Sequence, residues 1–162
     1  MLLERYLFFL FEQDPPGVNK ARQLNPQLYT ILKGIKVDLP TFNSFRTIVT
    51  TYQNNLKRCE RFLDLDLKMC TCNTKIDLFR KETVILGKAE RLCGVQRDPI
   101  DCREKVRNRI DQNNEQIKNQ QQRVISLRSE MIAKKNKTIQ DRRKQDQNVG
   151  KNISREVPVE KE

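Results

Sequence analysis

A long run of residues without a helix breaker most constrains what this chain can fold into. Residues 100–147 contain neither Pro nor Gly. The run follows "DPID", in which Asp98 suits the N-cap and Pro99 suits the first helical position, while Asp101 places an acid where it favours the helix dipole. These residues predict one helix over 99–147, about 70 Å long at about 1.5 Å per residue.

The predicted long helix carries only a thin apolar stripe. Its apolar residues recur at helical spacings, and two polar residues, Asn113 and Gln120, occupy positions of the same stripe. So narrow a stripe cannot pack the whole helix within a compact domain, and we expect its far half to project and meet a partner or a second copy. Asn113 and Gln120 would fix the register at some cost in stability. The predicted partner-binding stripe is Ile110, Ile117, Val124, Leu127 and Met131.

Upstream, the spacing of apolar residues predicts a helical hairpin. A helix is expected over about 42–68, with Thr41 as its cap, and a second over 75–92, with Glu82 facing solvent. The intervening "KMCTCNTK" interrupts the pattern. The seam of the first helix is Phe42, Phe45, Val49, Tyr52, Leu56, Cys59 and Leu63. The expected fold is therefore all-α, a small helical bundle or hairpin that continues into a long coiled-coil-like basic helix.

The first residues, "MLLERYLFFLF", are nearly all apolar. Eleven residues of helix rise only about 16 Å, against about 30 Å for the hydrocarbon core of a membrane. The segment lacks the positive charge and the small-residue cleavage site of a signal peptide. Burial against the rest of the domain is one interpretation, and contact with a membrane interface or a partner's groove is the other. The predicted contact residues are Leu7, Phe8, Phe9 and Phe11.

Composition and breakers divide the chain into four parts. Residues 1–40 hold the apolar segment and a short helix that begins at Pro26, residues 41–98 the hairpin, and residues 99–147 the long basic helix. The polar tail 148–162 is expected to be disordered.

The five cysteines do not have the spacing of a metal site. Cys70 and Cys72 lie at one end of the predicted helix 75–92, and Cys93 and Cys102 at the other, about 30 Å away. Sulfur ligands of zinc lie about 2.3 Å from the metal, so these four cannot share one ion. No metal and no cofactor is expected.

A disulfide between Cys93 and Cys102 fits the predicted connector. If one helix ends at Gly94 and the next is capped by Asp98, the two thiols face each other across an antiparallel turn. In a reducing compartment the same residues would be half-buried free thiols. Both alternatives stay open, and Cys59 is expected to be a core residue.

The net charge of +11 gathers in the last third of the chain, where residues 101–162 hold 16 Lys and Arg against 10 Asp and Glu. Such a balance suits contact with nucleic acid, anionic lipid or an acidic protein face, and also a plain solvated helix. No Phe, Tyr or Trp follows Phe79, so an RNA contact would be restricted to the phosphate backbone. The predicted basic patch is Lys134, Lys135, Lys137, Arg142, Arg143 and Lys144.

Catalysis is not expected. The chain has no histidine, the residue most often used as a general base, and neither a glycine-rich phosphate loop nor a paired acidic motif organises the other titratable groups. The sequence predicts a non-catalytic structural or adaptor subunit that docks through an extended amphipathic helix onto a larger protein assembly. Backbone binding of RNA and peripheral membrane association are the alternatives. An intracellular location is favoured because no convincing signal peptide or membrane span is present.

Overall fold

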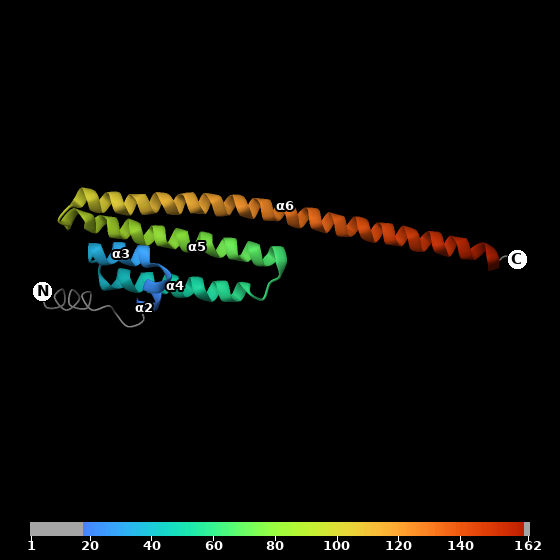
Figure 1. The fold of residues 1–162 in the computed structure, drawn as a ribbon, viewed down its shortest axis with the longest axis horizontal. Coiled ribbons are helices and arrows are strands. Elements are labelled where there is room, and N and C mark those ends of the chain that lie inside the picture. The colour runs from blue at the N-terminus through green and yellow to red at the C-terminus, as the bar shows by residue number, and fades with distance from the viewer. Residues whose placement is uncertain (1–17, 161–162) are drawn as a thin grey trace. The chain divides into compact units, whose positions relative to one another are not determined.

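The computed structural model describes the backbone of residues 18–160 and the side chains of residues 18–150 (Figure 1). Within 18–160 all regular structure is helical and no strand occurs, which confirms the predicted all-α fold. The predicted contact of Leu7, Phe8, Phe9 and Phe11 lies outside the described residues. The elements are α2 (Val18–Leu24), α3 (Pro26–Ile35), α4 (Leu39–Cys59), α5 (Asp64–Glu90), the 3-10 helix η1 (Arg91–Val95) and α6 (Pro99–Glu160).

Side-chain caps set the starts of α3 and α4. Asn25 Oδ1 accepts a hydrogen bond from the Leu28 N–H at 3.3 Å, and Pro26 occupies the first turn of α3, as the sequence predicts. In α4 the cap is Asp38 and not Thr41, because Asp38 Oδ1 accepts from the Thr41 N–H at 3.1 Å. Thr41 also donates its hydroxyl to the same carboxylate.

The turn between the hairpin helices lies earlier than predicted. The helix predicted over 42–68 ends at Cys59, and α5 begins at Asp64, whose φ of 53° is left-handed. A disulfide between Cys59 and Cys70 closes this turn. Cys59 is 1% exposed, so it is buried as its seam position predicts, and it also forms this bond. Closing a loop of this length contributes about 2.5–3 kcal/mol in the chain-entropy model.

The stretch "KMCTCNTK", predicted to break the helix, lies within α5. The hydroxyls of Thr71 and Thr74 donate to the carbonyls of Leu67 and Cys70, each at 2.8 Å. These hydrogen bonds give the threonine hydroxyls partners inside the helix. Threonine and asparagine side chains otherwise favour turns, because they can bond to the backbone there.

The turn between α5 and α6 has the predicted features except at Gly94. Asp98 caps α6 by accepting from the Asp101 N–H at 3.1 Å, and a disulfide joins Cys93 to Cys102. Gly94 is not a left-handed cap, because it lies inside η1. The turn is tied instead to α3, where Gln96 Nε2 donates to the Ile35 carbonyl at 2.7 Å.

The chain divides into two compact units, Met1–Val124 and Ile125–Glu162. In the first unit α5 and the first part of α6 run antiparallel beside each other (Figure 1). Apolar side chains from α2, α3, α4, α5, η1 and α6, and from the connector between α3 and α4, form its core: Val18, Ala21, Leu28, Leu32, Ile35, Val37, Phe42, Phe45, Ile48, Val49, Ile85, Leu86, Ala89, Cys93 and Val106.

Glu82 lies inside the first unit, which corrects its predicted place in solvent. Its side chain has no exposed surface, and Oε1 accepts from Arg109 Nε on α6 at 2.7 Å. Its other oxygen accepts from Asn25 Nδ2 at 3.3 Å. The sequence pattern missed this burial because the arginine that compensates the charge lies 27 residues away.

The long helix continues past its predicted end near residue 147. It runs through Gly150 to Glu160, so the tail predicted to be disordered over 148–162 is helical over 148–160, and residues 161–162 lie outside the described part. One glycine costs a helix only about 1 kcal/mol and does not by itself end it.

Replacing Arg109 by Met should destabilise the protein by about 3–5 kcal/mol, because it leaves the Glu82 carboxylate buried without a counter-charge. The matched control is Arg107→Met on the same helix. Arg107 pairs with Glu90 at 2.9 Å, but its side chain is 70% exposed, so we expect a loss below about 1 kcal/mol. Urea unfolding measures both, and equal losses would contradict the assigned role of the buried pair.

Candidate docking surface

The first part of α6 faces α5 within the first unit. Val106 is fully buried in the core, Ile110 packs against that core, and Val124 is 7% exposed. Ile117 and Met131 are half-buried, and Leu127 is 4% exposed. Within the first unit the chain thus covers Ile110 and Val124 of the predicted partner-binding stripe, and docking through the stripe stays a prediction.

The polar residues of this stripe therefore set a register inside the chain. Asn113 is 1% exposed, and its Nδ2 donates to Thr83 Oγ1 of α5 at 3.5 Å. Gln120 Oε1 is buried without a hydrogen-bond partner among the described residues. A buried polar side chain at these positions makes the fold less stable than an apolar one would. It also disfavours other registers of α6 against α5, in which it would lie among apolar side chains.

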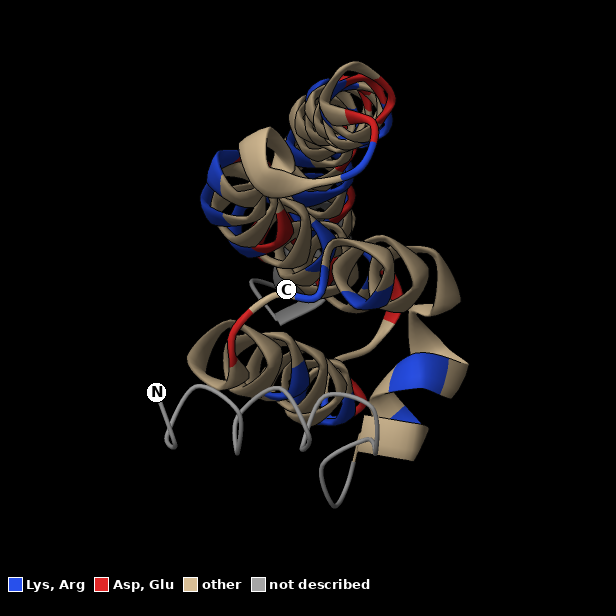
Figure 2. Ribbon diagram, turned by 90° about the vertical axis from the view of Figure 1, so that its left-hand side faces the viewer, with Lys and Arg blue, Asp and Glu red and all other residues tan. Residues whose placement is uncertain are grey.

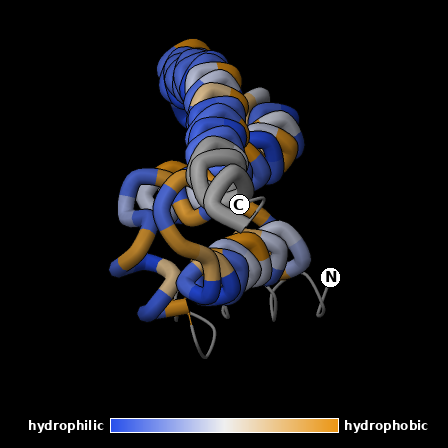
Figure 3. The backbone as a smooth tube through the Cα atoms, turned by 90° about the vertical axis from the view of Figure 1, so that its right-hand side faces the viewer, coloured by the Kyte–Doolittle hydropathy of each residue, from blue (hydrophilic) through white to orange (hydrophobic). Residues whose placement is uncertain are grey.

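A different set of apolar residues is exposed in the second unit. Ile125, Ile132 and Ile139 are 56%, 62% and 40% exposed. At about 100° per residue, a spacing of seven shifts each by only about 20° around the helix, so the three form one column, here called the isoleucine column. In Figure 3 apolar bands interrupt the otherwise hydrophilic tube of α6.

The sequence contains a signal for the isoleucine column that the predicted partner-binding stripe does not include. Val124, Leu127 and Met131 continue the spacing of the upstream stripe, so they extend it without a gap. The isoleucines recur at a strict interval of seven beside that stripe. The stripe and the isoleucines occupy different heptad positions, and this difference distinguishes the two sets in the sequence.

Cations flank the isoleucine column on one side. Arg128, Lys135 and Arg142 each follow an isoleucine by three residues, which places them about 60° away around the helix. All three are exposed, and no ion pair or hydrogen bond joins them to another described side chain. We call these three residues the cationic column.

The predicted basic patch is exposed but does not share one face. Lys135 and Arg142 belong to the cationic column, and Arg143 borders the isoleucine column on its other side. Lys134, Lys137 and Lys144 point to other sides of the helix. Lys and Arg occur on every helix (Figure 2). A one-sided cationic surface in this unit is therefore the column of Arg128, Lys135 and Arg142.

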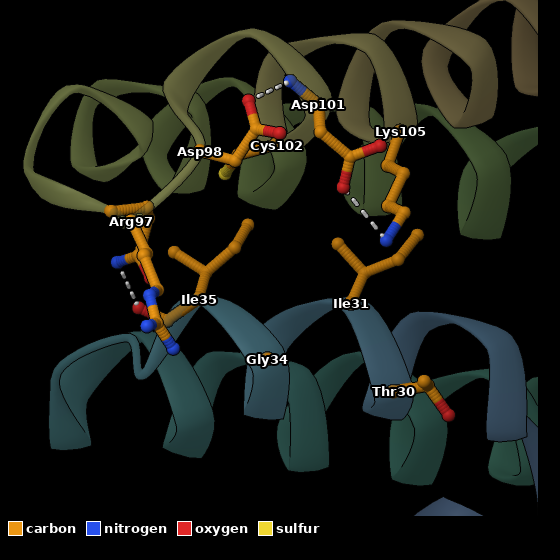
Figure 4. A pocket seen from close by; sticks show the side chains of 10 residues that line it. Thr30, Ile31, Gly34, Ile35, Arg97, Asp98, Asp101, Cys102 and Lys105 are labelled. Atoms are coloured by element: carbon orange, nitrogen blue, oxygen red, sulfur yellow. Dashed lines mark hydrogen bonds and ion pairs between the residues drawn. The ribbon is translucent and has the colours of Figure 1, made fainter.

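A groove in the first unit is the other candidate site. It has a volume of about 410 Å³ and lies between α3 and the start of α6, with Ile31 and Ile35 pointing into it (Figure 4). Lys105 Nζ donates to Asp101 at 2.9 Å, and this hydrogen bond, followed by the charge of the carboxylate, raises the pKa of Lys105 above its ordinary value. Lys105 and Asp101 thus pair with each other, Arg97 and Asp98 also line the groove, and Ile31 and Ile35 give it an apolar floor.

The described part of the chain contains neither a candidate metal cluster nor a membrane-spanning helix. Among the described side chains, those of residues 18–150, no cluster of His, Cys, Asp or Glu could hold a metal ion. No helix over the same residues has both the length and the apolar composition of a membrane span.

We compared the chain with protein-family models, curated proteins and solved structures. No protein-family model, no curated protein and no solved structure matches the chain.

Proposed function

We propose that the protein is a non-catalytic helical adaptor that docks onto a protein partner through the second unit. The observation that carries the proposal is the isoleucine column, in which three large apolar side chains at heptad spacing are about half exposed. Such a column is the half of a helix–helix seam that a single helix can supply. The partner is expected to lay its own apolar stripe along this column.

The first unit supports this role by holding the start of α6. Its core includes Val106, and its buried ion pair includes Arg109, so α6 is anchored where it begins. Isolated helices are marginally stable in water, and anchoring one end lowers the cost of ordering the rest for a partner. The absence of histidine and of any organised catalytic motif supports a binding role over an enzymatic one.

A protein partner suits the second unit better than lipid or RNA does. An interfacial membrane helix needs a broad apolar face with aromatic or leucine side chains, whereas this column is one residue wide. Stacking of RNA bases needs aromatic rings, and residues 125–162 contain none.

A library selection tests the docking proposal. Displayed amphipathic helices of about three heptads, with leucine seams and randomised flanks, would be selected against the full chain. We expect the recovered peptides to lose binding to the triple variant Ile125→Asp, Ile132→Asp, Ile139→Asp, since charges would replace its apolar column.

The matched control for this selection is Val149→Asp, because Val149 is 56% exposed on the same helix but lies off the column. It should leave binding unchanged. A selection without binders, or peptides that bind the triple variant as well as the native chain, would refute the proposal.

We also propose an oxidising compartment in place of the intracellular location expected from the sequence. The support is the pair of disulfides, since such bonds persist where the surroundings are oxidising. Cys72 is the remaining thiol and is buried.

Alkylation of the chain, isolated from its native source and then denatured, tests the compartment. Without reductant we expect one alkyl group, on Cys72, and after reduction five groups, one for each cysteine. Mass spectrometry counts them directly. Five groups without reductant would show that both disulfides are open in the native compartment.

A further inference from the structure

The surroundings of the isoleucine column carry charge of one sign. The residues three or four positions from Ile125, Ile132 and Ile139 are those that border the column on the helix surface. Four of them are cations and none is an acid. They are Gln121, Gln122, Arg128, Ser129, Lys135, Asn136, Arg142 and Arg143.

A second copy of this chain does not fit the column. In an antiparallel pair the cationic columns of the two copies would face each other. In a parallel pair Arg128 and Lys135 would face uncharged residues of the other copy, because no acid borders the isoleucines. Neither orientation gives the cations a partner, and like charges in contact are destabilising.

From these borders we infer that the partner segment is an acidic amphipathic helix, with an apolar stripe that packs on the isoleucine column and Asp or Glu opposite Arg128, Lys135 and Arg142. The inference rests on the proposed docking function and names the chemistry of its partner. Opposite charges at flanking positions of a helix pair determine which partner binds, while the apolar seam supplies most of the affinity.

Modification of Asn136 would block the docking surface. It lies between Ile132 and Ile139, is exposed, and begins the sequon Asn136-Lys137-Thr138. A glycan on Asn136 would cover the column, so the unglycosylated chain is the one that should bind.

Two synthetic helices test the inference. Both have the same leucine seam, and their flanking positions are all Glu in one and all Lys in the other. Fluorescence anisotropy at about 50 mM salt should show tighter binding of the Glu peptide to the full chain. The preference should shrink in about 0.5 M salt, because ions screen exposed charges.

Charge-reversal variants test whether the cationic column causes the preference for the Glu peptide. Lys135→Glu with Arg142→Glu should weaken binding of the Glu peptide roughly tenfold and strengthen that of the Lys peptide. The matched control is Lys137→Glu with Lys144→Glu, which has the same spacing and the same change in charge on another side of the helix. It should change either affinity less than about threefold.

The outcomes separate this inference from the docking proposal. If both peptides bind equally and Ile132→Asp abolishes both, the acidic partner is refuted and docking stands. If neither peptide binds, or Ile132→Asp changes nothing, the docking surface itself is refuted. Equal effects of the two charge reversals would overturn the acidic helix, and so would binding to single-stranded RNA in place of the Glu peptide. Undiminished binding by a chain glycosylated at Asn136 would refute the docking surface itself, because the glycan would cover the column.

Discussion

The buried ion pair between Glu82 and Arg109 is the contact on which the rest of the first unit depends. The carboxylate has no exposed surface and accepts from Arg109 Nε at 2.7 Å and from Asn25 Nδ2 at 3.3 Å. Arg109 also donates to Gln27. The network therefore joins the cap of α3, the middle of α5 and the start of α6. A carboxylate buried in this way is tolerated only when such partners are in place, so it disfavours every other arrangement of the three helices.

This constraint gives α6 two different surfaces along its length. From Val106 to Val124 its apolar stripe is used inside the first unit, with Asn113 as a polar marker of the register. From Ile125 onward a second set of apolar residues recurs at heptad spacing and is exposed. One helix thus contributes to the core of the fold and, on our proposal, provides the seam for an acidic partner helix.

Local sequence signals predicted the starts of α3 and α6, whereas the start of α5 and the packing of the helices were not predicted. Asp98 and Pro99 identify the start of α6 because a cap depends on neighbours within three residues. The first hairpin turn was placed too late because threonines in "KMCTCNTK" bond within α5, while the Cys59–Cys70 disulfide closes the turn earlier. The burial of Glu82 and of Ile110 depends on residues far along the chain, which a single periodic pattern does not reveal. The heptad spacing of the isoleucine column is present in the sequence, but its exposure is a property of the fold.

A pair of alanine variants tests most directly whether α6 has these two surfaces. Val106→Ala should lower the free energy of unfolding by about 1–3 kcal/mol, as for a buried apolar side chain, and leave binding of the Glu-flanked peptide unchanged. Ile132→Ala should change the stability by less than about 0.5 kcal/mol and weaken that binding severalfold. An Ile132→Ala variant as unstable as Val106→Ala, or one with undiminished binding, would contradict the account.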